Sequence, residues 1–227
     1  MKKFLLSIIL YLFLCVNSFS HLEHYNNVKS LEYDLYRNDN LIGSHKYDFI
    51  KKGDNLTVKS VVNFKISKLG IDLYNYFAES TENYKKDKFE SFNSTTIQNK
   101  KNKFVKIITN KENTKLMIDG SSFKGDTNID YMVGTWWNHE IVKAKAQISA
   151  ISGRIIEQKV NFLGKKQIKI NGRTYEALHF KFLSSDETLP DNKKLNTDIW
   201  YEAETLIWLK AQFIKQGNWE YRLRKLN

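Results

Sequence analysis

Residues 56–66 read LTVKSVVNFKI, and this stretch decides the fold class. Its even-numbered positions are mostly apolar, and the positions between them are mostly polar. An alternation with a period of two puts one face of an extended strand against a core and the other against water. The stretch therefore predicts a half-buried β-strand.

The same alternation recurs from residue 31 to the end of the chain, between turn clusters rich in Asn, Asp, Gly and Lys. The clearest turns are expected at residues 38–40, 51–55, 85–88 and 99–103, and Asn171-Gly172 is a strong hairpin signal. Short turns make neighbours in sequence pair, and about eleven strands in one meander would curl or close. We therefore predict an all-β fold, a curled antiparallel meander that forms a half-barrel or barrel, with one short helix.

The alternation is interrupted in a few places. Residues 120–137 break it, and Asn138 then stands where a helix N-cap belongs, ahead of helical spacing over residues 139–148. Gly164-Lys165-Lys166 predicts a turn, and the segment 184–193, which contains the single proline, predicts a loop. The one helix is expected to plug the curled sheet.

The N-terminus has the pattern of a signal peptide over residues 1–20, with a basic start, an apolar run over residues 4–16 and small residues before Ser20. The run is shorter than the roughly 20 residues that a membrane-spanning helix needs. We expect cleavage after Ser20, a single β domain over residues 21–227, no transmembrane segment in the mature chain, and a periplasmic or secreted location. An uncleaved membrane anchor is the alternative.

Composition narrows the possible partners. The formal net charge is +11, but only five of the 36 basic residues are Arg, the residue best suited to phosphate recognition, and the Lys residues are scattered. We therefore expect a solvated basic surface and no nucleic-acid partner. The only cysteine, Cys15, lies in the predicted signal peptide, which leaves the mature chain without a thiol.

Common enzyme signatures are missing from the sequence. It has no Gly-rich phosphate loop, no G-x-S-x-G motif, no H-E-x-x-H motif and no paired metal-ligand spacing. We predict no cofactor, no metal and no catalytic residue, although distant residues could still converge in a hydrolase. His21 and His24 could chelate copper if cleavage exposes an amine at His21, but an ordinary terminal segment is the preferred interpretation.

The unusual stretch around Trp136 gives the candidate site. Trp136 and Trp137 could form the apolar wall of a ligand site, with Asn138 or His139 as a polar anchor. The alternative is that the tryptophan pair fills the open end of the sheet as core, with Asn138 serving as a helix cap. A tryptophan-bearing hairpin adds Trp200-Tyr201 to the candidate ligand-binding residues.

Several motifs together resemble a family of exported bacterial proteins known only as a domain of unknown function. The resemblance rests on Tyr33-Asp34-Leu35-Tyr36-Arg37, Leu41-Ile42-Gly43, Trp136-Trp137-Asn138 and Asp198-Ile199-Trp200-Tyr201. It implies a periplasmic antiparallel β protein and no particular activity. The hairpin at residues 199–209 is also similar to those of periplasmic lipoprotein carriers, which is a likeness of fold alone.

Two functions follow as hypotheses. The first is a binding module whose concave face takes an apolar ligand such as a lipid or acyl chain. The second is an envelope structural or interaction protein that meets a protein partner without a small ligand.

Overall fold

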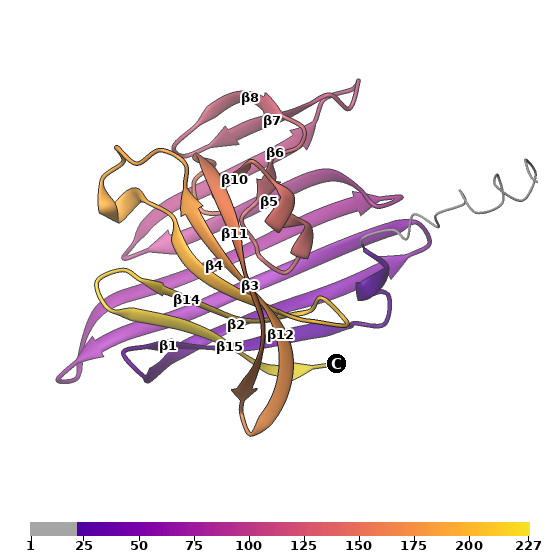
Figure 1. Cartoon of the computed structure of the whole chain (residues 1–227). Helices are drawn as coiled ribbons and strands as arrows, with labels where there is room; N and C mark the ends of the chain where they lie inside the picture. Colours follow the sequence, from indigo (N-terminus) through magenta and orange to yellow (C-terminus); the bar gives the residue numbers. More distant parts are fainter. Residues whose placement is uncertain (1–21) are drawn as a thin grey trace, which may run out of the picture.

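The computed structural model describes residues 22–227, and its strands form one continuous sheet (Figure 1). The predicted signal peptide, residues 1–20, and His21 lie outside these residues. The strands are β1 (Ser30–Arg37), β2 (Asn40–Lys52), β3 (Asn55–Lys68), β4 (Ile71–Lys85), β5 (Lys88–Gln98), β6 (Lys101–Thr109), β7 (Lys115–Gly120), β8 (Lys124–Asn128), β9 (Met132–Val133), β10 (Ala146–Ile148), β11 (Ile155–Ile170), β12 (Arg173–Ser184), β13 (Asn196–Glu202), β14 (Trp208–Ile214) and β15 (Asn218–Leu226).

The helical segments of the described chain are three short 3-10 turns. They are η1 (Glu23–Tyr25), η2 (His139–Lys143) and η3 (Asp191–Lys193). In this part of the chain no helix has the length and apolar character needed to cross a bilayer.

The strand order is β8-β7-β6-β5-β4-β3-β2-β1-β15-β14-β13-β12-β11-β10-β9. Neighbouring strands are antiparallel except β9 and β10, which are parallel. The first and last strands, β1 and β15, pair in the interior of the sheet, whereas its two edges, β8 and β9, come from the middle of the sequence. The predicted curled antiparallel meander is confirmed.

Turn chemistry explains the hairpins. Both central residues of Asn38-Asp39, Lys86-Asp87, Asn99-Lys100 and Asn171-Gly172 have positive φ. This pair of left-handed conformations matches the right-handed twist of the flanking strands, and Asn, Asp and Gly adopt it most readily. The turns predicted at these positions are confirmed.

Two local predictions need correction. The turn predicted at Gly164-Lys165-Lys166 is wrong, because β11 runs through it with a register shift between Phe162 and Gly164, where Gly164 has φ +102°. A bulge bends the strand without ending it. The helix predicted over residues 139–148 stops at Lys143 as η2, and residues 146–148 pair with β11 as strand β10.

Gln158 explains the early end of η2. Its side-chain amide donates to the carbonyls of Ile141 and Ala144, both at 2.9 Å, and accepts from Gln147 Nε2 at 2.6 Å. The carbonyls at the end of the turn thus accept hydrogen bonds from a side chain, so they do not require the backbone N–H groups of a further helical turn. Periodicity within residues 139–148 carries no information about a partner ten or more residues away.

Side chains from the two ends of the sheet pack together where strand pairing stops. In Figure 1, β11 and β12 run across the direction of the long strands β2 to β5. Val133 of β9 and Ile148 of β10 are buried with Phe92, Ile107 and Ile118 from β5 to β7 in one apolar cluster. A larger cluster fills the curl between β1 to β4 and β11 to β15.

Candidate functional site

Three tyrosine hydroxyls hold the segment at residues 135–137 inside the curl. Tyr47 of β2 donates to the carbonyl of Thr135, Tyr201 of β13 to that of Trp136 at 2.9 Å, and Tyr25 of η1 to that of Trp137. The Thr135 carbonyl also accepts from Trp137 N at 2.8 Å, whereas the segment belongs to no strand that could supply donors to the other two carbonyls. The three hydroxyls fix the segment between the two halves of the sheet.

A buried carboxyl group anchors the same segment. Glu82 of β4, 4% exposed, accepts from Trp137 Nε1 at 2.9 Å, from Thr135 Oγ1 at 3.3 Å and from the Tyr84 hydroxyl. Burial raises the pKa of Glu82 above its usual value of 4.5, and the hydrogen bonds from Tyr84, Trp137 and Thr135 oppose that rise. Glu82 is the partner of the tryptophan motif, and no sequence pattern pointed to it.

The structure separates the predicted site residues into groups. Trp137, fully buried, and Asn138, 2% exposed, belong to the interior, and Asn138 Oδ1 caps η2 by accepting from Glu140 N at 3.1 Å. His139 contacts Glu140 Oε1 through Nε2 at 3.2 Å and meets the His24 ring edge-on at 5.2 Å between ring centroids. These three residues are therefore part of the buried interior.

The remaining three predicted residues lie on both faces of the sheet. Trp136 is half-buried, has a left-handed backbone at φ +59°, and accepts the Tyr201 hydroxyl at its carbonyl. Its ring packs edge-on against Trp208 and Tyr221. Trp200 lies on the outer face, stacked on His179 at 4.3 Å between ring centroids. The structure thus brings Trp136 and Tyr201 together and leaves Trp200 on the other side of the sheet.

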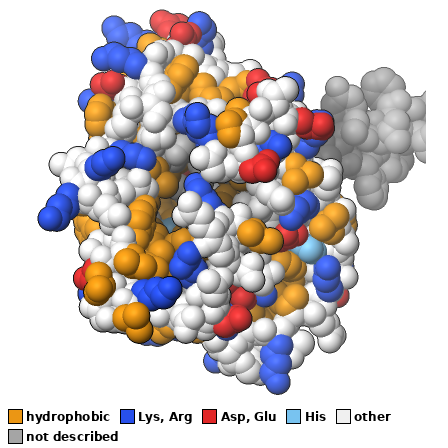
Figure 2. Space-filling model, turned by 90° about the vertical axis from the view of Figure 1, so that its left-hand side faces the viewer, with side chains coloured by type: hydrophobic (Ala, Val, Ile, Leu, Met, Phe, Trp, Pro, Cys, Tyr) orange, Lys and Arg blue, Asp and Glu red, His pale blue; other side chains and the backbone are white. Residues whose placement is uncertain are grey.

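A cavity of about 360 Å³ opens beside Trp136 on the concave side of the sheet. Figure 2 shows this side of the molecule hollowed near its middle, with hydrophobic side chains and several Lys or Arg side chains around the hollow. Its volume is near the lower end of the roughly 300–1,000 Å³ of small-molecule pockets. The aromatic part of the lining comes from Tyr47, Tyr76, Trp136, Phe213 and Tyr221.

Small residues create the cavity. Ser60, Ser80 and Ser94 face one another in register across β3, β4 and β5, and Ala78 and Thr96 pair in an adjoining row. All five line the cavity. Because inward positions of a curled sheet normally carry large apolar side chains, two adjoining rows of small ones leave space. This serine row is the signal that sequence reasoning missed.

The floor of the cavity contains neutral polar groups. His45 shares a hydrogen bond with Ser60, Nε2 to Oγ at 2.7 Å, and burial lowers the pKa of His45 to about 3, which keeps the ring uncharged. Within the described chain, His45 Nδ1 and Trp136 Nε1 are buried without a hydrogen-bond partner. Such atoms carry a desolvation cost that a bound polar group could relieve.

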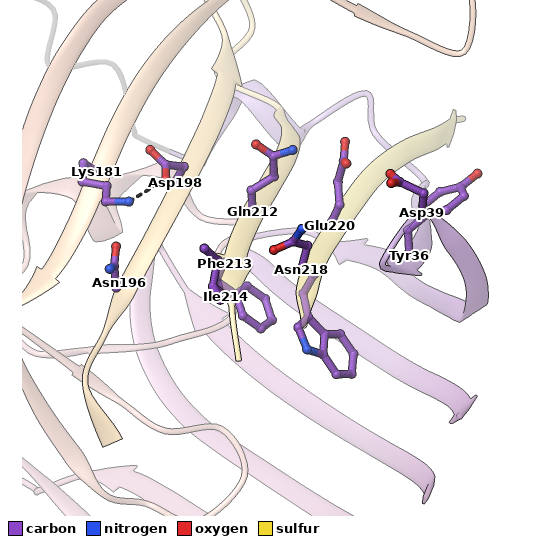
Figure 3. Close-up of a pocket in the computed structure, with 11 residues that line it drawn as sticks. Tyr36, Asp39, Lys181, Asn196, Asp198, Gln212, Phe213, Ile214, Asn218 and Glu220 are labelled. Carbon is purple, nitrogen blue, oxygen red and sulfur yellow. Dashed lines mark hydrogen bonds and ion pairs between the residues drawn. The ribbon is translucent and has the colours of Figure 1, made fainter. Parts of the chain in front are cut away.

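The outer face has a second hollow of about 350 Å³, drawn in Figure 3. Lys181, Asp198, Gln212, Glu220 and Tyr36 lie in register across five strands there.

Both carboxylates of that row have cationic partners. Asp198 binds Lys181 at 2.6 Å and His179 at 2.8 Å, and Glu220 binds both Lys210 and Arg222 at 2.8 Å. The row is best explained as an ionic ladder on the sheet. Over residues 22–227, no group of three or more potential ligands could hold a metal ion.

The sequence matches the model of one protein family over residues 33–224, a family described as "Domain of unknown function (DUF6134)". Among curated proteins, none is similar enough to this sequence to count as a match.

Solved structures match the fold. A crystal structure from Brucella abortus, described as a β-barrel-like protein of domain of unknown function DUF1849, has a TM-score of 0.59 and 13% identity, and the match covers 87% of this chain and 96% of that chain. A DUF1329 family protein from Desulfovibrio piger matches with a TM-score of 0.28 and 7% identity over 91% of this chain and 88% of that one. The first likeness supports the β-barrel-like fold, and the second adds nothing to it.

Proposed function

Because this chain belongs to the DUF6134 family, whose description names no activity, we propose a function from its cavity: a binding module that takes an apolar ligand, such as a lipid or acyl chain, inside the curled sheet. The observation that carries this proposal is the pair of adjoining rows of small side chains that open a cavity beside Trp136. Aromatic side chains around it offer a large apolar contact area. A protein that needed only a stable core would gain by filling this space.

We also propose that the chain is exported to the periplasm or beyond, with residues 1–20 as a cleaved signal peptide. The pattern of basic, apolar and small residues supports this. N-terminal sequencing of the protein recovered from the cell envelope tests it. A mature terminus at His21 is the expected result, and an intact Met1 would refute cleavage.

Native mass spectrometry tests the ligand. The mature protein, purified from its own periplasm without detergent, is expected to carry a stoichiometric adduct that organic extraction removes. A cavity-filling variant, Ser80→Phe, should lose the adduct, because Ser80 lines the cavity. Thr81→Phe places the same ring on the next residue of β4, whose side chain points to the opposite face, and should keep it.

A second candidate function is supported by the outer surface. Phe77, Ile97, Phe104, Ile108 and Met117 are each more than a third exposed on β4 to β7. Neighbouring exposed apolar side chains mark protein-protein contact surfaces. An envelope interaction protein would use this surface, and crosslinking in the periplasm to a protein partner, combined with a clean apo mass, would favour it over the binding module.

A further inference from the structure

Two cations lie at the cavity without an acidic partner. Lys215, which is exposed, and Arg154, which is half-buried, both line it. Neither forms an ion pair within the described chain. The Arg154 guanidinium is held by the carbonyl of Lys193 at 3.3 Å from both Nη1 and Nη2. That contact positions the group and leaves its positive charge uncompensated.

The rest of the lining does not neutralise these charges. Its one acidic residue, Glu79, accepts from Thr95 Oγ1 at 3.3 Å, and both residues are exposed on the outward-facing positions of β4 and β5. The ring of His45 stays uncharged on the floor. The cavity therefore has a neutral interior and a net positive rim.

This polarity selects one kind of ligand. An apolar body gains from contact with Trp136 and Tyr221 in the interior, whereas an anionic group gains only at the rim, where it stays partly hydrated. Arg154 can bind a carboxylate or a phosphate through the N–H groups that do not point to the Lys193 carbonyl, and Lys215 adds a second positive charge. Each such contact at a partly hydrated rim contributes a modest free energy.

We infer that the cavity binds an anionic amphiphile, with its apolar part inside and its acid group at the rim formed by Arg154 and Lys215. This inference rests on the proposed function, and it specifies the head group that the proposed function leaves open. The acid group can be the carboxylate of a fatty acid or the phosphate of a lipid. Both present oxygen anions that a guanidinium recognises.

Three probes with the same chain separate these possibilities: dodecanoate, dodecyl phosphate and dodecanol. Delipidated protein is titrated with each probe, and binding is followed by calorimetry and by tryptophan fluorescence. We expect at least one of the two anions to bind about tenfold more tightly than the alcohol, a difference of about 1.4 kcal/mol. The tighter anion identifies the head group, and added salt should reduce the preference.

Variants link the preference to the rim. The double variant Arg154→Gln with Lys215→Gln should lose the preference for anions and bind dodecanol unchanged. The matched control, Arg173→Gln with Lys59→Gln, makes the same change in net charge at exposed positions that do not line the cavity. It should keep the preference.

The outcomes distinguish the two levels of the proposal. Equal binding of anions and alcohol by the native protein would overturn the inference and leave the binding module standing. A preference that survives the rim double variant would also overturn it. Failure of all three probes to bind would overturn the inference together with the proposed function.

Discussion

Trp137 donates its indole N–H to the carboxyl group of Glu82 at 2.9 Å, and both side chains are buried. The sequence separation between the two residues is 55. This hydrogen bond ties the irregular segment at residues 135–137 to strand β4.

The two adjacent tryptophans should respond differently to the same substitution. Trp137→Phe removes a buried hydrogen bond to a carboxyl group and should lower the free energy of unfolding by about 1.5–3 kcal/mol. Trp136→Phe removes an N–H that has no partner in the described chain, and the loss should stay below about 1 kcal/mol. Urea unfolding followed by circular dichroism measures both. Equal losses would show that the Glu82 bond contributes little.

The Tyr201 hydroxyl should stabilise the left-handed backbone of Trp136. Tyr201→Phe leaves the Trp136 carbonyl without its 2.9 Å donor, and we expect a loss of about 1–3 kcal/mol in unfolding free energy. Tyr175→Phe, at a half-buried position of β12, is the control and should cost less. A cost no larger than that of the control would show that the Tyr201 hydroxyl contributes little to stability.

Glu82 should make the protein less stable as the pH rises. Its pKa is raised in the folded state by burial, so the native protein holds a proton that the unfolded chain releases near pH 4.5. The contribution of Glu82 to the free energy of unfolding is therefore fully present below about pH 4.5 and is lost as the pH rises through the pKa of the folded state. The loss is about 1.4 kcal/mol for each pH unit between the unfolded and the folded pKa.

The neutral variant tests this contribution. Glu82→Gln cannot ionise, so its stability relative to the native protein should improve between about pH 4.5 and about pH 8. Urea unfolding of both proteins at the two pH values gives the difference in unfolding free energy between variant and native protein at each pH. If this difference is the same at both pH values, Glu82 has the same pKa in the folded and the unfolded state.

Glu220 should show the opposite pH dependence. Burial tends to raise its pKa, but Arg222 and Lys210 outweigh burial and hold the pKa at about 2, below its usual 4.5. Its contribution is present above about pH 4.5 and is lost as the pH falls toward 2. Glu220→Gln should therefore cost at most about 3 kcal/mol near neutral pH and almost nothing near pH 2. The unfolding free energy of the native protein and of Glu220→Gln is measured as a function of pH. A difference between them that stays constant down to about pH 2 would refute this prediction.

Gly43 should not tolerate a side chain. A Cβ at this position would lie 2.1 Å from the Asn63 carbonyl oxygen, because β2 and β3 approach closely there. Gly43→Ala should separate the strands and lower the unfolding free energy by about 1–3 kcal/mol. Ser44→Ala, the next residue along β2, is the control for a small change in the same strand. Thermal unfolding of the two variants makes the comparison.

The fold class could be predicted from the sequence because its determinants are local. Alternation in residues 56–66 requires a half-buried strand, and pairs such as Asn171-Gly172 require tight hairpins. The bulge at Gly164 was mistaken for a turn because glycine and lysine are typical of both. The local sequence does not show whether the partner strand β12 continues to pair beyond Gly164, which is what distinguishes a bulge from a turn.

The candidate site was predicted only in part because it depends on pairing register. Trp136 and Tyr201 are both predicted as ligand-binding residues, and the Tyr201 hydroxyl binds the Trp136 carbonyl. Ser60, Ser80 and Ser94 are unremarkable in sequence, and they form the floor of a cavity only because three strands align them. Glu82 is buried by the curl of the sheet, and nothing in the residues next to it in sequence indicates that burial.

The pairing of β1 with β15 has a consequence for biosynthesis. Leu31 lies opposite Leu226, so the hydrogen bonds between these strands cannot form until the chain is available as far as residue 226. Strands β1 to β8 can pair with one another before β15 is available. Until then β1 has an unpaired edge, which is a template for aggregation. Contacts between such distant residues also make folding slow. A nascent chain of this architecture therefore has its most vulnerable edge at its first strand, and only its last strand covers it.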